Sequence, residues 1–301
     1  MKLKNLMVAV RANFLLLAVV LGFLGTSLAW YEHQEYGSSF SLGYAFIAGV
    51  GLVLAHISVN VFNDYFDFRS KLDYKTPRTP FSGGSKAIVD GLITVKQALW
   101  LAIGSLVIAA AVGIFFTLTQ GWFLLPLLLV SVVIILIYTP FILRLGYPEW
   151  AAGLGLGTLP ILGAYFIQTG EYTITALIAA VPSGILVHNL LLLNEIPDAE
   201  ADKTVKRRTL PIVAGKKNAA IVYSVLMLIM YLWIIGAVIT HDMPAFTLLG
   251  LLTLPLAYKA INGSFKFNDM SKLVPALANN VFVVLLTQLL MGVGFILAGA
   301  F

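Results

Sequence analysis

Long runs of apolar residues are the feature that most constrains this chain. A helix needs about 20 mostly apolar residues to cross a bilayer. Of the 301 residues, 59% are hydrophobic and 11% are charged, which is far from the average of soluble domains. The sequence therefore predicts an all-α integral membrane protein with nine transmembrane helices, near residues 11–30, 41–66, 95–118, 122–140, 148–167, 174–196, 217–240, 244–261 and 274–299.

Charged residues predict how these helices are oriented. If the amino terminus is cytoplasmic, all 19 Lys and Arg fall on the cytoplasmic side, and the opposite loops carry only acidic charges. Cytoplasmic loops of membrane proteins are enriched in Lys and Arg. We therefore expect a multi-pass protein of the cell membrane with a cytoplasmic amino terminus and an outside carboxyl terminus. The chain contains no cysteine, which excludes disulfides and thiolate chemistry.

The second apolar stretch ends in an acidic motif, residues 60–73. On a helix, Asn60, Asn63, Asp64 and Asp67 project from one face. Ionised groups at the end of a membrane helix are functional candidates, because they are costly to bury and usually face a cavity or a partner. Two carboxylates at this spacing repel each other unless a cation lies between them.

A second acidic motif, residues 194–202, closes the sixth apolar stretch. Asn194, Asp198 and Asp202 are four residues apart and share one helix face. Two such faces at the same end of two helices can enclose one acidic site, whose oxygen ligands favour Mg²⁺ with phosphate oxygens as further ligands. A helix end emerging into water would also tolerate aspartate, but two matched motifs favour a site.

Each acidic motif is followed by a basic loop, which indicates a metal-bridged polyanion rather than a bare cation. We expect a substrate with a diphosphate head and a hydrocarbon tail, whose allylic carbocation is kept from water between apolar helices. Lys206, Arg207 and Arg208 could instead bind anionic lipid. Aromatic faces that could stabilise the carbocation are those of Tyr65, Phe66, Tyr138, Tyr147 and Trp150.

A loose internal repeat relates the two halves of the chain. Stretches two and six carry the acidic motifs, while stretches four and eight end in Tyr138-Thr-Pro and Tyr258-Lys-Ala. We expect two pseudo-repeated four-helix units plus one helix around a central cavity, within a single domain over residues 1–301.

The chain resembles the UbiA superfamily of intramembrane prenyltransferases. The resemblance is carried by Asn63, Asp64 and Asp67, by Asp198 and Asp202, and by the nine spans. In many members a third carboxylate follows the second by four residues, where this chain has Lys71. Asp73 instead takes the place expected in the branch that makes menaquinone precursors, the 1,4-dihydroxy-2-naphthoate prenyltransferases and their vitamin K2-synthesising relative, and whether it binds metal stays open. Similarity to that branch lies in residues 63–73, 83–86, 91–93, 138–140, 163–165, 168–170 and 194–210.

The resemblance implies Mg²⁺-dependent transfer of a polyprenyl group from its diphosphate to an aromatic acceptor. In the naphthoate branch the prenyl group replaces a carboxyl group lost as carbon dioxide. The implied catalytic residues are Tyr138, near the reacting carbon, and four aspartates: Asp64, Asp67, Asp198 and Asp202. The implied ligands of two Mg²⁺ ions are Asn60, Asp64 and Asp67 for one and Asn194, Asp198 and Asp202 for the other. The implied substrate-binding residues are Arg11, Asn63, Arg69, Lys71, Arg78 and Lys203.

Two other functions stay open at this point. Some relatives transfer geranylgeranyl to a glycerol-phosphate lipid in archaeal lipid synthesis, and the acidic residues alone do not identify the acceptor. From another class, an ion or polyanion transporter would line its path with similar carboxylates, but the second stretch shows few polar groups toward the outer face.

Overall fold

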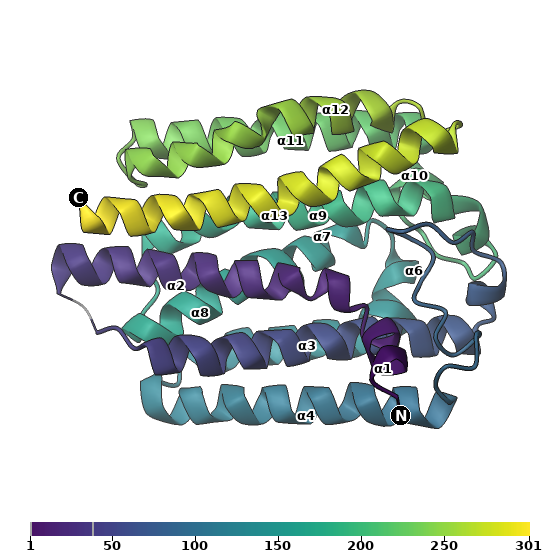
Figure 1. Cartoon of the computed structure of the whole chain (residues 1–301), viewed down its shortest axis with the longest axis horizontal. Helices are drawn as coiled ribbons and strands as arrows, with labels where there is room; N and C mark the ends of the chain where they lie inside the picture. The colour runs from purple at the N-terminus through teal and green to yellow at the C-terminus, as the bar shows by residue number, and fades with distance from the viewer. Residues whose placement is uncertain (1, 38) are drawn as a thin grey trace.

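A computed structural model describes residues 2–37 and 39–301 and shows a bundle of long helices that run side by side (Figure 1). Across those residues nine helical segments are long and apolar enough to cross a membrane, and no strand occurs, which confirms the predicted fold class. Six of the spans are continuous helices: α2 (Leu16–Tyr36), α3 (Leu42–Arg69), α4 (Val95–Gln120), α9 (Ile174–Lys203), α11 (Lys216–Ile239) and α13 (Met270–Ala300).

Three spans are interrupted. The fourth consists of α5 (Leu124–Ile137), a π-helical turn (Tyr138–Ile142) and α6 (Leu143–Leu145). The fifth consists of α7 (Glu149–Gly153), a second π-helical turn (Leu154–Thr158) and α8 (Leu159–Thr169), and the eighth is a 3₁₀ helix (Ala245–Thr253) followed by α12 (Leu254–Ser264). Pro140 lies in the first π-helical turn and has no N–H to donate, so the regular hydrogen-bond ladder cannot continue through it.

Local sequence signals set several helix starts. Thr94 and Gln97 form a reciprocal cap at the start of α4, with Gln97 N donating to Thr94 Oγ1 at 3.1 Å and Thr94 N donating to Gln97 Oε1 at 2.9 Å. Ser41 and Thr173 accept from backbone N–H groups at the starts of α3 and α9. The two helices that carry the acidic motifs therefore both begin at a capped end and finish at the opposite end of the bundle.

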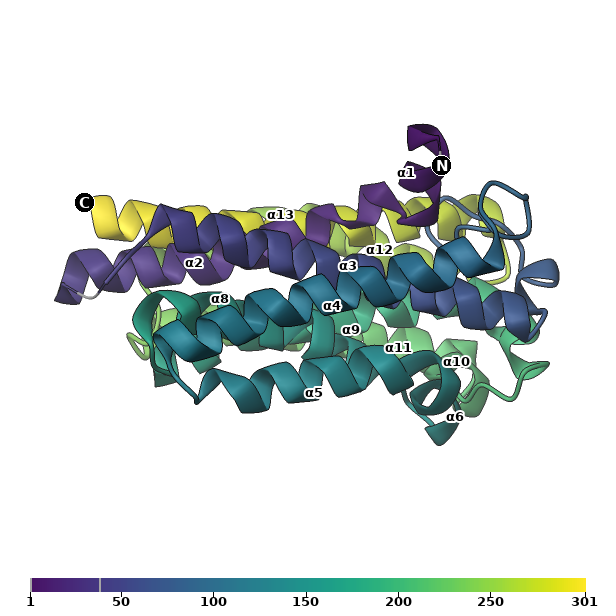
Figure 2. The same ribbon diagram turned by 90° about the horizontal axis from the view of Figure 1, so that it is seen from below.

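The structure adds elements that the apolar pattern did not predict. A short helix, α1 (Leu3–Ala9), precedes the first span and projects from the bundle (Figure 2). Single turns at Ala12–Phe14 and Leu72–Tyr74 and the short α10 (Leu210–Val213) lie at the same end of the molecule as the acidic motifs. In addition, α3 runs to Arg69 rather than to the predicted residue 66, so Asp67 still belongs to the helix.

Buried polar contacts fix the second half of the bundle. Asn189 of α9 donates to Tyr223 O of α11 at 3.0 Å, Tyr223 Oη donates to Asn280 Oδ1 of α13 at 2.9 Å, and Asn280 Nδ2 donates to Asn189 O at 3.3 Å. All three side chains are fully buried. Because an unsatisfied polar group would be costly at this depth, the closed set of bonds favours one relative placement of the three helices.

Close helix approach depends on a small residue at position 157. A Cβ added at Gly157 would lie 2.6 Å from the backbone oxygen of Ser183 on α9, which is much shorter than any normal contact. By contrast, a Cβ at Gly104 on α4 would meet no atom within 4 Å. The second π-helical turn can therefore contact α9 only because it lacks a side chain there.

We predict that Gly157→Ala lowers the stability of the protein and that Gly104→Ala does not. The first substitution forces the two backbones apart and should cost about 1–3 kcal/mol, whereas alanine in an open helical position is favourable by about 0.5–1 kcal/mol. Thermal unfolding of the two variants in the same detergent measures the difference. Equal melting temperatures for both variants would contradict the packing argument.

Candidate active site

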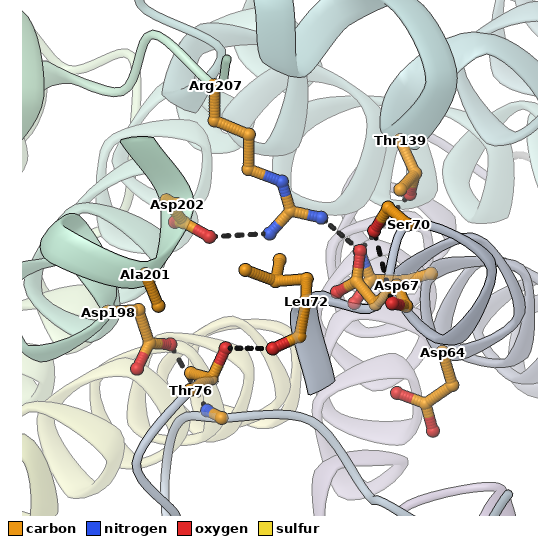
Figure 3. A network of polar contacts seen from close by, with 12 residues as sticks. Asp64, Asp67, Ser70, Leu72, Thr76, Thr139, Asp198, Ala201, Asp202 and Arg207 are labelled. Carbon is orange, nitrogen blue, oxygen red and sulfur yellow. Dashed lines mark hydrogen bonds and ion pairs between the residues drawn. The ribbon is translucent and has the colours of Figure 1, made fainter. Parts of the chain in front are cut away.

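The two acidic motifs meet at one end of the bundle, around a cavity of about 120 Å³ that we call the polar chamber. Asp64 and Asp67 lie in the last turns of α3, and Asp198 and Asp202 in the last turns of α9. Asp64, Asp67 and Asp202 are buried, and Asp198 is half-buried. Figure 3 shows Asp64 and Asp67 on one side of this space and Asp198 and Asp202 on the other. Asp67, Asn194, Asp198 and Asp202 all line the chamber, so residues of both predicted metal groups face the same space.

The loop between α3 and α4 closes over the chamber and contacts both motifs. Gly83 N donates to Asp198 Oδ2 at 3.1 Å, while Ser85 N donates to Asp64 Oδ1 at 3.3 Å. The hydroxyl of Ser85 also donates to Asp64 Oδ2. Gly83 and Gly84 have φ of +84° and +72°, a backbone region in which a side chain is strained. The two glycines thus allow the backbone to turn toward both carboxylates.

Arg11 supplies a cation to the first motif. It lies just before the first span with φ of +52°, and its Nη2 contacts Asp64 Oδ1 at 2.6 Å. Burial lowers the pKa of Arg11, but the carboxylates of Asp64, Asp67 and Asp73 together raise it more, so the pKa is raised overall. The predicted diphosphate-binding Arg11 therefore lies inside the chamber, as a counterion to Asp64.

A second cation, Arg207, joins the two motifs directly. Its Nη1 contacts Asp202 Oδ1 at 3.0 Å, and its Nη2 contacts Asp67 Oδ1 (Figure 3). The side chain is only 12% exposed. Burial lowers its pKa, but Asp67 and Asp202 raise it more, so the guanidinium stays charged. The sequence did not distinguish Arg207 from its neighbours Lys206 and Arg208, because nothing in the order of residues says which loop cation turns inward.

Asp73 also lies in the chamber, on the turn Leu72–Tyr74. Its side chain is buried, and no described residue bonds its Oδ2 atom. Burial raises the pKa of Asp73 to about 7, with further contributions from Asp67 and Asp64. A nearby cation would restore the ionised form, so Asp73 is placed where it could interact with a metal.

The remaining predicted site residues occupy different places. Asn63 Nδ2 donates to Thr139 Oγ1 at 3.1 Å, and Asn60 Nδ2 contacts Val10 O at 3.5 Å. Four predicted diphosphate-binding residues, Arg69, Lys71, Arg78 and Lys203, do not line the chamber. Lys71 is exposed, Arg78 contacts Asp90 at 3.1 Å, and Lys203 pairs with Glu200 at 2.9 Å on the surface. Arg69 is exposed beside Tyr65.

A second cavity, which we call the apolar cavity, lies beside the chamber in the membrane-spanning region. Its volume is about 430 Å³. It follows α3 from Asn63 and Asn60 down to Ala48 and is lined mostly by aliphatic side chains of α3, α4, α5 and α8. The two cavities share four lining residues, Arg11, Asn63, Tyr138 and Leu191. A polar head in one cavity could therefore be joined to an apolar chain in the other.

Of the aromatic residues that the sequence singled out, Tyr138 lies at this junction. It begins the first π-helical turn, and no described residue bonds its buried hydroxyl. Phe66 borders another pocket nearby, described below. Tyr147 and Trp150 are 50% and 52% exposed. The ring of Tyr138 is thus the aromatic face best placed between head and tail.

The chemistry of the chamber fits Mg²⁺. Its lining includes five acidic residues and two arginines, a formal charge of −3. The Oδ1 atoms of Asn194 and Asp198 are buried with no bonding partner among the described residues. Among the described residues, no group of three acidic or histidine side chains forms a ready-made metal site. Asp64, Asp67 and Asp202 contact arginines instead. Mg²⁺ usually takes only one or two carboxylates and completes its shell with water and phosphate oxygens, so such a preformed cluster is not required.

Comparisons with known proteins agree with this geometry. The model of the UbiA prenyltransferase family matches residues 33–286. The 1,4-dihydroxy-2-naphthoate octaprenyltransferase of Bacillus subtilis is 33% identical over 71% of this chain and 68% of that protein. A UbiA homologue from Aeropyrum pernix has a TM-score of 0.72 at 16% identity, covering 95% of this chain and 98% of that one. A UbiA homologue from Archaeoglobus fulgidus, bound to DMAPP and Mg²⁺, has a TM-score of 0.63 at 14% identity over 92% of this chain and 98% of that one.

We predict that Gly84→Ala weakens divalent-cation binding and that Gly91→Ala does not. Both glycines have positive φ, +72° and +66°, so both substitutions strain the backbone to a similar degree. A Cβ at Gly84 would also lie 2.9 Å from Asp73 Oδ1, whereas one at Gly91 would meet nothing within 4 Å. Titration of the purified variants with Mn²⁺, followed by electron paramagnetic resonance, measures the binding. Equal Mn²⁺ affinity in both variants would contradict a role for the loop in shaping the chamber.

Proposed function

This chain belongs to the UbiA prenyltransferase family, and we propose that it transfers a polyprenyl group from its diphosphate to an aromatic acceptor. It is an integral membrane prenyltransferase. We further propose 1,4-dihydroxy-2-naphthoate as the acceptor, in a step of menaquinone biosynthesis. This choice is supported by the relative from B. subtilis, whose name states that activity, and by the motifs shared with the naphthoate branch.

The observation that carries the proposal is that the two cavities lie side by side and share four lining residues. The polar chamber has acidic residues for a metal and the arginine side chain of Arg11 for a diphosphate, and the apolar cavity begins at the same residues. A prenyl diphosphate has this division into an anionic head and an apolar tail. A transporter would need a polar path onward to the opposite face, whereas beyond Asn60 the cavity is lined mainly by aliphatic side chains.

In the proposed reaction the allylic carbon–oxygen bond breaks and its electron pair leaves with the diphosphate. The allylic carbon then bonds to the ring carbon that carries the carboxylate, and that carboxylate departs as carbon dioxide, leaving its electron pair to the ring. Bound Mg²⁺, held by Asn60, Asp64 and Asp67 and by Asn194, Asp198 and Asp202, would supply neutralisation of the charge on the diphosphate oxygens.

The chain's own residues have separate roles in this step. Arg11, at the junction of the two cavities, would bind the diphosphate and orient it, and Asn63, held by its bond to Thr139, would help to position the head. The ring of Tyr138 would stabilise the allylic carbocation through its face. The aliphatic walls of the apolar cavity would exclude water, which would otherwise capture the cation. The exposed Arg69, Lys71, Arg78 and Lys203 would attract the donor to this end of the molecule.

We also propose an orientation and a domain assignment. The amino terminus and the loop between α3 and α4, whose residues line the chamber, lie at one end of the bundle, and the carboxyl terminus lies at the other end (Figure 1). By the distribution of Lys and Arg, the chamber would face the cytoplasm. Residues 1–301 would act as a single domain, because α3 and α9, from the two halves of the chain, both contribute to the chamber.

The acceptor can be identified by a direct comparison. Purified protein with Mg²⁺ and one labelled prenyl diphosphate would be offered dihydroxynaphthoate, 4-hydroxybenzoate or a geranylgeranylglyceryl phosphate, with products separated by mass spectrometry. The proposal expects a prenylated naphthalene ring and release of carbon dioxide. A prenylated glycerol lipid in its place would identify the archaeal-lipid activity, and transfer to no acceptor would refute the proposed function.

We predict that Asp198→Asn reduces Mg²⁺-dependent diphosphate release by about 100-fold or more, because it removes a charge that the metal needs. The amide oxygen can still accept from Gly83 N, so the loop contact is retained. Asp64→Asn should have a similar effect. Asp242→Asn, a change of the same type in a loop at the opposite end of the bundle, is the control and should retain activity. If Asp198→Asn kept activity within threefold of wild type, Asp198 would not be needed to bind the metal.

We predict that Ala48→Trp shortens the prenyl chain that the protein accepts. Ala48 is buried and lines the deep part of the apolar cavity, about 22 Å along α3 from Asn63 at 1.5 Å per residue. A bulky ring there should spare transfer of dimethylallyl and reduce transfer of long polyprenyl groups by about tenfold or more. Val50→Trp, on the exposed face of the same helix, is the matched control. An equal loss for short and long donors would contradict the tail assignment.

A further inference from the structure

A third cavity lies next to the polar chamber, and we call it the vestibule. Its volume is about 340 Å³. Three arginines line it, Arg69, Arg144 and Arg207, together with Asp67 as its one acidic residue. Arg69 and Arg144 are exposed, and neither pairs with a carboxylate of the described residues. The vestibule is therefore cationic, whereas the chamber beside it is acidic.

The ion pair between Asp67 and Arg207 separates these two cavities. Both residues line the chamber and both line the vestibule, so their contact lies between the two spaces. The backbone around Arg207 is anchored: Arg207 N donates to Asp202 O at 3.2 Å, and Arg208 N donates to Leu143 O at 2.8 Å. The long side chain can therefore move between the cavities while the loop stays in place.

A divalent cation would compete with Arg207 for the same atoms. The guanidinium holds Asp67 Oδ1 and Asp202 Oδ1, one oxygen from each acidic motif. Two cations a few ångström apart in a poorly hydrated site repel each other strongly. Binding of a metal to these carboxylates would therefore release Arg207, and the other cavity that its side chain borders is the vestibule.

We propose that Arg207 is a movable counterion, which closes the chamber in the metal-free protein and, once displaced by metal, completes a vestibule site for inorganic diphosphate with Arg69 and Arg144. This inference rests on the proposed function, because inorganic diphosphate is the product that must leave the chamber. Arginine side chains bind such an anion through paired N–H groups. The vestibule is then the exit through which the product leaves, on the side away from the apolar cavity.

The first test measures metal binding without any prenyl donor or acceptor. We expect Arg207→Met to bind Mn²⁺ about tenfold more tightly than wild type, because the guanidinium no longer competes with the metal for Asp67 and Asp202. Arg207→Lys keeps the charge but cannot span both carboxylates, so it should also bind Mn²⁺ more tightly. Arg208, the next residue, lines neither cavity. The same change there, Arg208→Met, should therefore leave the affinity for Mn²⁺ unchanged.

Thermal unfolding separates this role from a purely structural one. Arg207→Met leaves two buried carboxylates unpaired, so its melting temperature should fall without metal and be restored by Mn²⁺ to a greater extent than in wild type. Weaker or unchanged Mn²⁺ binding in both Arg207 variants would overturn the proposal. An equal gain in Mn²⁺ affinity in Arg208→Met would also overturn the proposal, because it would show a general effect of removing positive charge. If the methionine variant does not fold, the lysine variant decides.

The second test measures binding of inorganic diphosphate by calorimetry in the presence of Mn²⁺. Arg144→Gln should weaken this binding about tenfold, the loss expected for one charge-assisted contact. Arg208→Gln should bind the anion as wild type does. If Arg144→Gln bound inorganic diphosphate as tightly as wild type, the vestibule would not be the binding site. Neither test uses prenyl transfer, so absence of transfer in wild type would refute the proposed function while leaving the outcome for Arg207 to be judged by itself.

Discussion

The structure depends on how four aspartates are kept at the ends of two membrane helices. Asp64, Asp67 and Asp202 are buried, and a buried carboxylate without a partner is among the least tolerated features of a protein interior. The chain stabilises them with two arginines that lie outside the helices. Arg11 precedes the first span, and Arg207 follows the sixth. These contacts tie the amino-terminal segment and the loop after α9 to the end of α3, and so bring together parts of the chain that are almost 200 residues apart.

The same arrangement explains why the polar chamber and the apolar cavity lie side by side. The face of α3 that carries Asn60 and Asn63 continues toward the opposite membrane face as Leu52, Gly51 and Ala48, all of which line the apolar cavity. One helix thus changes from amide and acidic residues to small apolar residues along a single face. Small side chains leave space where larger ones would fill it, so the sequence of α3 determines both the polar character of the chamber and the room for a tail below it.

The sequence predicts some features of the fold and the site but not others, and the physical reason differs from one feature to the next. The nine spans and the helical faces of the two motifs follow from periodicity and length, which are local properties. The interruptions at Tyr138–Ile142 and Leu154–Thr158 were not predicted, because a π-helical turn leaves the apolar pattern unchanged. The inward turn of Arg207 was not predictable either. It depends on two carboxylates, of which Asp67 is 140 residues away, and neighbouring cations in the same loop look equivalent in the sequence.

The two arginines also bear on how an acidic site can exist before its metal arrives. A cluster of unpaired carboxylates would repel and open the helix ends, whereas fixed ion pairs would leave no ligands for a metal. The chamber avoids both states. Asn194 and Asp198 each present a buried oxygen that no described residue bonds, while Asp67 and Asp202 are held by one long side chain from a loop. Such a contact is strong enough to hold the helix ends together, and it can be exchanged for a divalent cation because the cation satisfies the same oxygens. Asp67 and Asp202 then have a cationic partner in both states, and α3 and α9 need not move apart for the exchange to occur.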